Sequence, residues 1–201
     1  RYISIDALSL VFNRTALTSV AIAGYMLWKK RPFSASTKEL RFMALCGILI
    51  AVHWITFFGA IKIANVSITL AGVSTGALFS ALLNPILNKG KLDPVELALG
   101  AIVVVGIVIV FYEEPNAASI KTYAWAGYTL TNYQLGLLIA LFSASLSASF
   151  SILNKQLVAR YPFPVQVTFW ELSFAFIGVA LYDLIAGSHN PMTLWATTAN
   201  D

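Results

Sequence analysis

Charged residues are scarce in this chain. Its 201 residues include 13 lysines and arginines, 9 aspartates and glutamates and 2 histidines. Charged residues make up 11% of the chain, against about 25% in typical soluble domains. Hydrophobic residues make up 58%, and the mean hydropathy is +0.76. This number of polar side chains is too small to cover the surface of a water-soluble globule. The composition therefore predicts a membrane protein.

Cysteine is scarcer still. The single cysteine, Cys46, lies inside an apolar run and excludes an intramolecular disulfide. The two histidines, His53 and His189, are far apart in the chain. The sequence contains no zinc-spaced His/Cys cluster, no G-x-S-x-G and no phosphate-binding loop. We therefore expect no enzymatic activity, no cofactor and no metal.

Two features of a natural chain start are missing. Residue 1 is arginine rather than methionine, and no charged, apolar, small-residue leader follows it. The end, "TLWATTAND", shows no evident terminal element. We therefore expect this chain to be a piece of a longer protein.

Long apolar runs dominate what is present. A membrane-spanning helix needs about 20 apolar residues. Six segments have this length and character: 8–28, 41–61, 66–88, 95–112, 133–157 and 164–186. They predict an all-α transmembrane fold.

Turn signals separate the apolar runs. We expect Thr37 to cap the helix that follows it, with Glu39 one position too early for a capping box. Gly90 suits a helix C-cap, and Pro94 suits a first helical turn. The longest polar loop is 113–132.

The basic residues are distributed unequally between the two sides of the predicted membrane protein. If the helices alternate in direction, one side holds nine of them: Lys29, Lys30, Arg31, Lys38, Arg41, Lys89, Lys91, Lys155 and Arg160. The other side holds Arg1, Lys62 and Lys121, and Arg14 lies inside a helix. The positive-inside rule places the larger group in the cytoplasm and the 113–132 loop outside. Because the basic residues form short clusters between apolar runs, we expect no nucleic-acid partner.

Two apolar segments align with each other. "LVFNRTALTSVAIAGYML" (10–27) and "VTFWELSFAFIGVALYDL" (167–184) place Arg14 opposite Glu171. Four positions are identical: Phe12 and Phe169, Ala23 and Ala180, Tyr25 and Tyr182, Leu27 and Leu184. The charge pattern gives the two segments opposite directions, and inverted repeats are common in secondary transporters. We therefore expect two inverted five-helix repeats of a ten-helix carrier, with about six helices present.

This repeat organisation predicts the division of the chain. Residues 1–112 form the first repeat without its first helix, and 113–132 form the extracytoplasmic loop. Residues 133–201 begin the second repeat.

The segment 53–110 resembles a known family. It contains the His53-Trp54 pair followed by Phe57 and Phe58, then an "NVS" turn, Asn84-Pro85 and a Gly-rich helix from Glu96. In this order these features resemble the third-to-fifth-helix block of EamA-type carriers of the drug/metabolite transporter superfamily. "SASFSILNKQLVARYPFPVQVTFWELSF" resembles the start of the second half of that family. The resemblance covers nearly the whole chain except the 113–132 loop and the tail.

The resemblance implies ten helices, cytoplasmic ends and a central substrate cavity in the bacterial inner (plasma) membrane. It implies alternating-access transport, frequently export, of small polar metabolites such as amino acids. The partners would be a small-molecule solute and the lipid bilayer, and a homo-oligomer is compatible with this reading. Two alternatives stay open. A nucleotide-sugar or phosphate-ester carrier of the same superfamily would need a basic cavity, for which the visible helices offer only Arg14. A membrane scaffold would transport no solute.

Arg14 and Glu171 are the first pathway candidates. Each lies roughly 10 Å from its helix start at 1.5 Å per residue, and the midplane lies about 15 Å in. Their opposite directions place them in opposite halves of the membrane, so we expect no direct salt bridge. They either line the polar pathway, one toward each mouth, or anchor their helices. Glu171 is the better candidate for a proton site, because burial disfavours a charged carboxylate.

His53, Trp54 and Phe57 share one helix, and His53 and Phe57 are one turn apart. His53 either bonds a solute or accepts a proton, or it is satisfied by a neighbouring helix. Trp54 either stacks on a ligand or fills a gap between helices.

Small and hydroxyl residues supply the other candidates. Gly72-x-x-x-Gly76 favours close helix packing, while Ser74 or Thr75 faces the cavity. We expect Asn84-Pro85 to weaken its helix near the cytoplasmic end. Four-residue spacing places Ser143, Ser147 and Ser151 on one stripe that Asn154 continues, either lining the cavity or packing against a helix. Ser147 and Asn154 are the pathway candidates of this stripe.

Overall fold

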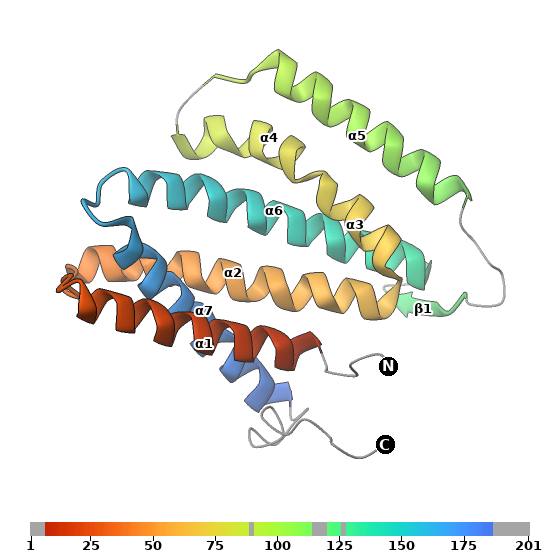
Figure 1. Ribbon diagram of the computed structural model, residues 1–201. Helices are drawn as coiled ribbons and strands as arrows, with labels where there is room; N and C mark the ends of the chain where they lie inside the picture. Colours follow the sequence, from red (N-terminus) through yellow and green to blue (C-terminus); the bar gives the residue numbers. More distant parts are fainter. Residues whose placement is uncertain (1–6, 89–90, 114–119, 126–127, 187–201) are drawn as a thin grey trace. The chain divides into compact units, whose positions relative to one another are not determined.

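The computed structural model describes residues 7–88, 91–113, 120–125 and 128–186. Within them the chain forms helices and one β-hairpin (Figure 1). The elements are α1 (Ala7–Trp28), α2 (Thr37–Ile63), α3 (Val66–Ser74), α4 (Gly76–Asn88), α5 (Pro94–Glu113), β1 (Thr122–Trp125), β2 (Tyr128–Thr131), α6 (Asn132–Val158) and α7 (Pro164–Ala186). Arg1, Lys89, Gly90 and His189 lie outside the described residues.

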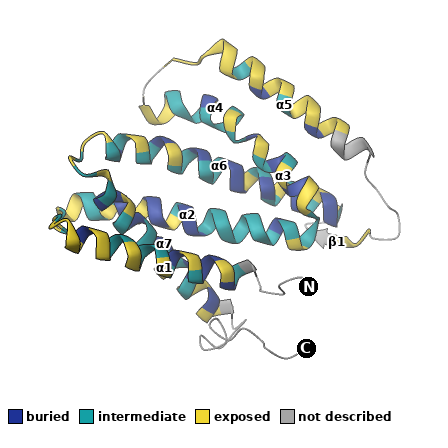
Figure 2. Ribbon diagram, in the orientation of Figure 1, coloured by how far each residue is buried: buried dark blue, intermediate teal, exposed yellow. Residues whose placement is uncertain are grey.

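Five helical segments are long and apolar enough to cross a membrane. They are Leu8–Trp28, Thr37–Ile63, Val66–Asn88, Asn132–Val158 and Pro164–Ile185. The sixth predicted span corresponds to α5, whose stretch Pro94–Ile109 is apolar but shorter. Figure 2 shows exposed residues along most of α5, among them Ile102, Val105 and Ile109. The described chain is mostly helical, and its long apolar helices agree with the prediction of a multi-pass membrane protein. The inverted repeats stay a prediction.

The chain forms two compact units. Of the described residues, those up to Val52 and those from Asn154 on belong to the first unit, and those between them belong to the second. Each is described by itself below.

In the first unit, α1 packs against α7, and the rings of Phe12 and Phe176 are 4.8 Å apart between centroids. The first part of α2 meets α7 at Gly47. A Cβ atom at Gly47 would lie 2.6 Å from the carbonyl oxygen of Glu171 and 2.6 Å from Cβ of Phe174. Only a residue without a side chain allows this approach, so Gly47 determines how closely the two helices pack.

The connection between α1 and α2 has its own local order. Lys30 adopts a left-handed conformation with φ 51°. The N–H of Lys30 bonds the carbonyl of Leu27, and the N–H of Arg31 bonds that of Met26. This is a Schellman motif, in which a non-glycine residue occupies the position that usually favours glycine.

The N-cap of α2 is Ser36, so the prediction of Thr37 as the cap is wrong. The N–H of Ser36 donates to Oε2 of Glu39 at 2.8 Å, and the N–H of Glu39 donates to Oγ of Ser36 at 3.4 Å. With Ser36 as the cap, Glu39 has the three-residue spacing that a capping box requires. By contrast, Pro94 begins α5 as predicted, after Asp93 whose side chain accepts from the N–H of Val95.

In the second unit, α6 meets α2 and α3 at small residues. A Cβ atom at Gly136 would clash with Cβ of Ala64, just after the end of α2, and one at Gly72 would lie 2.6 Å from Cβ of Ala140. The packing role predicted for Gly72 is therefore confirmed. The same role for Gly76 is wrong, because a Cβ atom there would meet nothing within 4 Å. Figure 1 shows α4 and α5, which pack against each other.

The predicted helix 66–88 is interrupted near its middle. Oγ of Ser74 donates to the carbonyl of Ala71, and Oγ1 of Thr75 donates to that of Gly72, each at 2.6 Å. The N–H of Thr75 also bonds the carbonyl of Gly72. The backbone bond of Thr75 reaches back three residues instead of four, which tightens the last turn of α3, and the two hydroxyl groups bond carbonyls of the same turn. Pro85, expected to weaken this helix, lies inside α4, which continues to Asn88.

The 113–132 loop contains a hairpin that the sequence did not predict. β1 and β2 are antiparallel, with Thr122 opposite Thr131 and Tyr123 opposite Leu130. Thr131 and Gln134 then form a second capping box, which begins α6.

Candidate functional site

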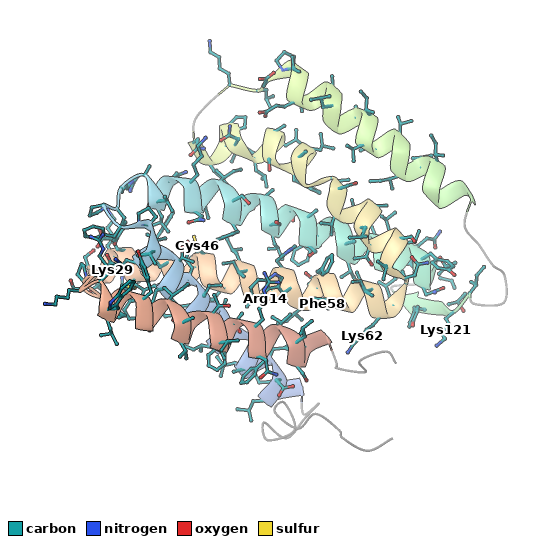
Figure 3. All side chains as sticks on the ribbon, viewed as in Figure 1. Arg14, Lys29, Cys46, Phe58, Lys62 and Lys121 are labelled. Carbon is teal, nitrogen blue, oxygen red and sulfur yellow. The ribbon has the colours of Figure 1, made fainter. Side chains whose placement is uncertain are left out.

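A buried carboxyl group marks the first unit. Glu171, on α7, is 3% exposed, and its Oε1 atom is buried without a hydrogen-bond partner in the described part of the chain. The thiol of Cys46, on α2, is fully buried and interacts with the carboxyl group of Glu171. Figure 3 labels Cys46 on α2. The adjacent Gly47 brings α2 close to α7, which explains how a short thiol side chain reaches the carboxyl group.

Sequence reasoning identified Glu171 but missed Cys46. A lone cysteine within an apolar run has the same signature as a small hydrophobic residue. The one local sign was the glycine next to it, since a small residue in a membrane helix often marks a close helix contact.

A second polar contact lies within the second unit, between His53 of α2 and Ser143 of α6. Nδ1 of His53 is 2.9 Å from the carbonyl oxygen of Ser143 and 2.8 Å from its Oγ atom. Oγ of Ser143 donates to the carbonyl oxygen of His53 at 2.9 Å. Ser143 is fully buried, whereas His53 is half-buried. One edge of the imidazole is therefore satisfied by a neighbouring helix, which was one of the two predicted roles.

Aromatic rings continue from His53 along α2. The His53 and Phe57 rings lie 6.1 Å apart between centroids and are tilted by 33°, as their one-turn spacing predicted. The Phe57 and Phe58 rings are 5.1 Å apart, edge to face, and Figure 3 labels Phe58. Trp54 is half-buried and interacts with another residue.

The remaining candidates form neither of these two contacts in the described structure. Arg14, labelled in Figure 3, is an exposed residue of α1 that interacts with another residue. The hydroxyl groups of Ser74 and Thr75 bond their own helix. Ser147 is half-buried on α6. Asn154, on the same helix, has a buried Oδ1 atom without a hydrogen-bond partner among the described residues.

Both polar contacts lie deep along their helices. His53 is about three residues past the midpoint of α2, and Glu171 is about four residues before the midpoint of α7. At 1.5 Å per residue, each is about 5–6 Å from the middle of its helix. Both groups therefore lie in the central part of an apolar helix and not near its ends.

The fold defines the class of the molecule, a multi-pass α-helical membrane protein with polar groups near the middle of its spans. No protein-family model, curated protein or solved structure matches the chain. Within the described residues, no group of three or more histidine, cysteine, aspartate or glutamate side chains could hold a metal ion.

Proposed function

We propose that this chain is part of an EamA-type secondary-active carrier in the bacterial inner membrane that moves small polar metabolites, such as amino acids, by alternating access. The observation that carries the proposal is the carboxyl group of Glu171. An ionisable group inside an apolar span is costly, and such groups generally belong to solute, ion or proton pathways. In this reading the protein has no enzymatic role.

The state of the carboxyl group favours transport over a scaffold role. A structural anchor is stable when all of its polar atoms are paired, because an unpaired buried acceptor costs about 1–3 kcal/mol. The thiol of Cys46 interacts with the carboxyl group, and Oε1 is left without a hydrogen-bond partner in the described structure. A proton or the amino group of a solute would complete this site.

A carrier of nucleotide sugars or phosphate esters has less support. Such a solute needs cations within the spans, since Arg and Lys side chains bind phosphate through charge-assisted hydrogen bonds. Arg14 is the basic residue near the middle of a described span, and it is exposed on α1. The polar groups of the two contacts near the helix midpoints are a carboxyl, a thiol, an imidazole and a hydroxyl group.

The test is untargeted metabolite uptake and efflux in membrane vesicles that contain the protein, compared with empty vesicles. We expect at least one small polar metabolite to move above the empty-vesicle level. Glu171→Gln should reduce that movement by about tenfold or more, the effect of losing about 1.4 kcal/mol. Glu96→Gln, at an exposed position in the first turn of α5, is the matched control and should transport normally. If no solute moves above empty vesicles, the carrier function is wrong.

A further inference from the structure

The hydrogen bonds of His53 determine which ring nitrogen carries the proton. A carbonyl oxygen can only accept a hydrogen bond, so Nδ1, at 2.9 Å from the carbonyl oxygen of Ser143, must be the donor. Oγ of Ser143 uses its own proton on the carbonyl of His53 and can accept a share of the same N–H. In an apolar span the neutral ring is favoured over the charged one. A neutral ring protonated at Nδ1 has a bare lone pair on Nε2.

Nε2 lies on the edge of the ring away from Nδ1. Among the described residues, the side-chain hydrogen bonds of His53 all run through Nδ1, and they hold the ring between α2 and α6 within the second unit. The side chain stays half-buried, and the Phe57 ring is tilted beside it. The ring therefore presents an oriented hydrogen-bond acceptor beside an aromatic surface, near the middle of the span.

We infer that Nε2 of His53 accepts a hydrogen bond from an N–H or O–H group of the transported solute, whose apolar part lies against Phe57. The inference rests on the proposed transport function and narrows its substrate class. Amines, amino acids and alcohols carry such donors. A phosphate or carboxylate oxygen is an acceptor and is repelled by the bare nitrogen, so an anion without a donor group is excluded from this position.

One substitution separates recognition by Nε2 from the structural role of Nδ1. In His53→Asn the amide nitrogen takes the place of Nδ1 and can still donate to Ser143, but nothing replaces Nε2. In Ser143→Ala the hydroxyl bond between the helices is lost, while the Nδ1 bond to the carbonyl of residue 143 and the bare Nε2 are retained. Recognition by Nε2 predicts that His53→Asn impairs transport more than Ser143→Ala does, and a purely structural role predicts the opposite order.

The probe is a mixture of isotopically labelled proteinogenic amino acids, with efflux measured from vesicles that contain the whole chain. We expect His53→Asn to lower efflux by about tenfold, the usual effect of losing one hydrogen bond to a solute, with an unchanged melting temperature. Efflux equal to wild type in His53→Asn overturns the inference and leaves the transport function standing. If the wild-type protein moves neither an amino acid nor any other metabolite, the transport function fails and the inference fails with it.

A spectroscopic measurement keeps the inference testable if His53→Asn does not fold. The sequence has two histidines, so His189→Gln leaves the ring of His53 as the one imidazole signal. We expect the ¹⁵N spectrum to show a protonated Nδ1 and a bare Nε2, whose resonance shifts when the transported amino acid is added. A protonated Nε2, or a resonance that stays unchanged at saturating amino acid, overturns the inference.

Discussion

The two glycines of the Gly72-x-x-x-Gly76 motif differ in packing, and alanine substitution should separate them. A Cβ atom at Gly72 would lie 2.6 Å from Cβ of Ala140 and 3.2 Å from Cδ1 of Leu137. A Cβ atom at Gly76 would meet nothing within 4 Å. We therefore expect Gly72→Ala to destabilise the protein and Gly76→Ala to be neutral or stabilising.

The magnitude follows from the contact distance. Carbon atoms pack best at about 3.5–4.0 Å, so α3 and α6 must separate by about 1 Å to accept the new methyl group. Overpacking of this kind costs about 1–3 kcal/mol. Replacing a helical glycine by alanine returns about 0.5–1 kcal/mol. The net change in the free energy of unfolding is a loss of about 0.5–2 kcal/mol for Gly72→Ala and a gain of up to about 1 kcal/mol for Gly76→Ala.

The assay is reversible unfolding in mixed micelles, followed by tryptophan fluorescence. Gly72→Leu and Gly76→Leu extend the series, because the larger side chain should increase the loss at residue 72 but not at residue 76. The close approach of α3 to α6 is refuted if Gly72→Ala is as stable as Gly76→Ala.

Three further predictions concern the segments that flank the spans. Ser36→Ala removes the capping box of α2 and should cost about 1 kcal/mol, whereas Thr37→Ala should leave the free energy of unfolding nearly unchanged; equal losses would contradict the cap assignment. Lys30→Gly relieves the left-handed strain at φ 51° and should raise the free energy of unfolding by about 0.5–1 kcal/mol; a loss of stability would show that this residue is not left-handed. Burial, together with the nearby Glu39 carboxylate, raises the pKa of Tyr161 to about 12. The folded protein therefore holds this proton above pH 10, so the contribution of Tyr161 to stability should be constant below pH 10 and fall as the pH rises toward 12. Phenolate absorbance, compared with that of Tyr161→Phe, measures the pKa directly, and an ordinary pKa near 10 would contradict the burial of this phenol.

The spans could be predicted from the sequence because hydropathy alone determines them, but their ends and breaks could not. Hydropathy placed the start of the second span at residue 41, whereas α2 begins at Thr37. Lys38 and Glu39 are polar enough to hide this first turn, which the capping box stabilises. The interruption at Thr75 involves hydroxyl groups that bond nearby carbonyls. The sequence does not predict it, because serine and threonine also occur in uninterrupted apolar helices.

The candidate site was predictable by residue type but not by contact. Glu171 and His53 were recognisable because an acid and an imidazole are rare within apolar spans. Their partners, Cys46 and Ser143, are small residues that are common in membrane helices, and each lies on a helix distant in sequence from the group it contacts. Such pairs follow from how the helices pack, which composition and spacing do not specify.

The polar contacts lie close to the glycine contacts that bring the helices together. Gly47 is adjacent to Cys46, and Ala140, which meets Gly72, lies one turn before Ser143 on α6. Thiol and hydroxyl side chains are short, so they reach a partner only where two helices come closer than larger side chains allow. A Gly47 variant would therefore disturb both the packing of α2 on α7 and the contact between Cys46 and Glu171, and its loss of transport would not separate the two. Glu171→Gln changes the chemistry while it retains the size of the side chain, and His53→Asn removes Nε2 while it retains a donor at the place of Nδ1. They are therefore the variants that can show whether the polar contacts take part in transport or only hold the helices together.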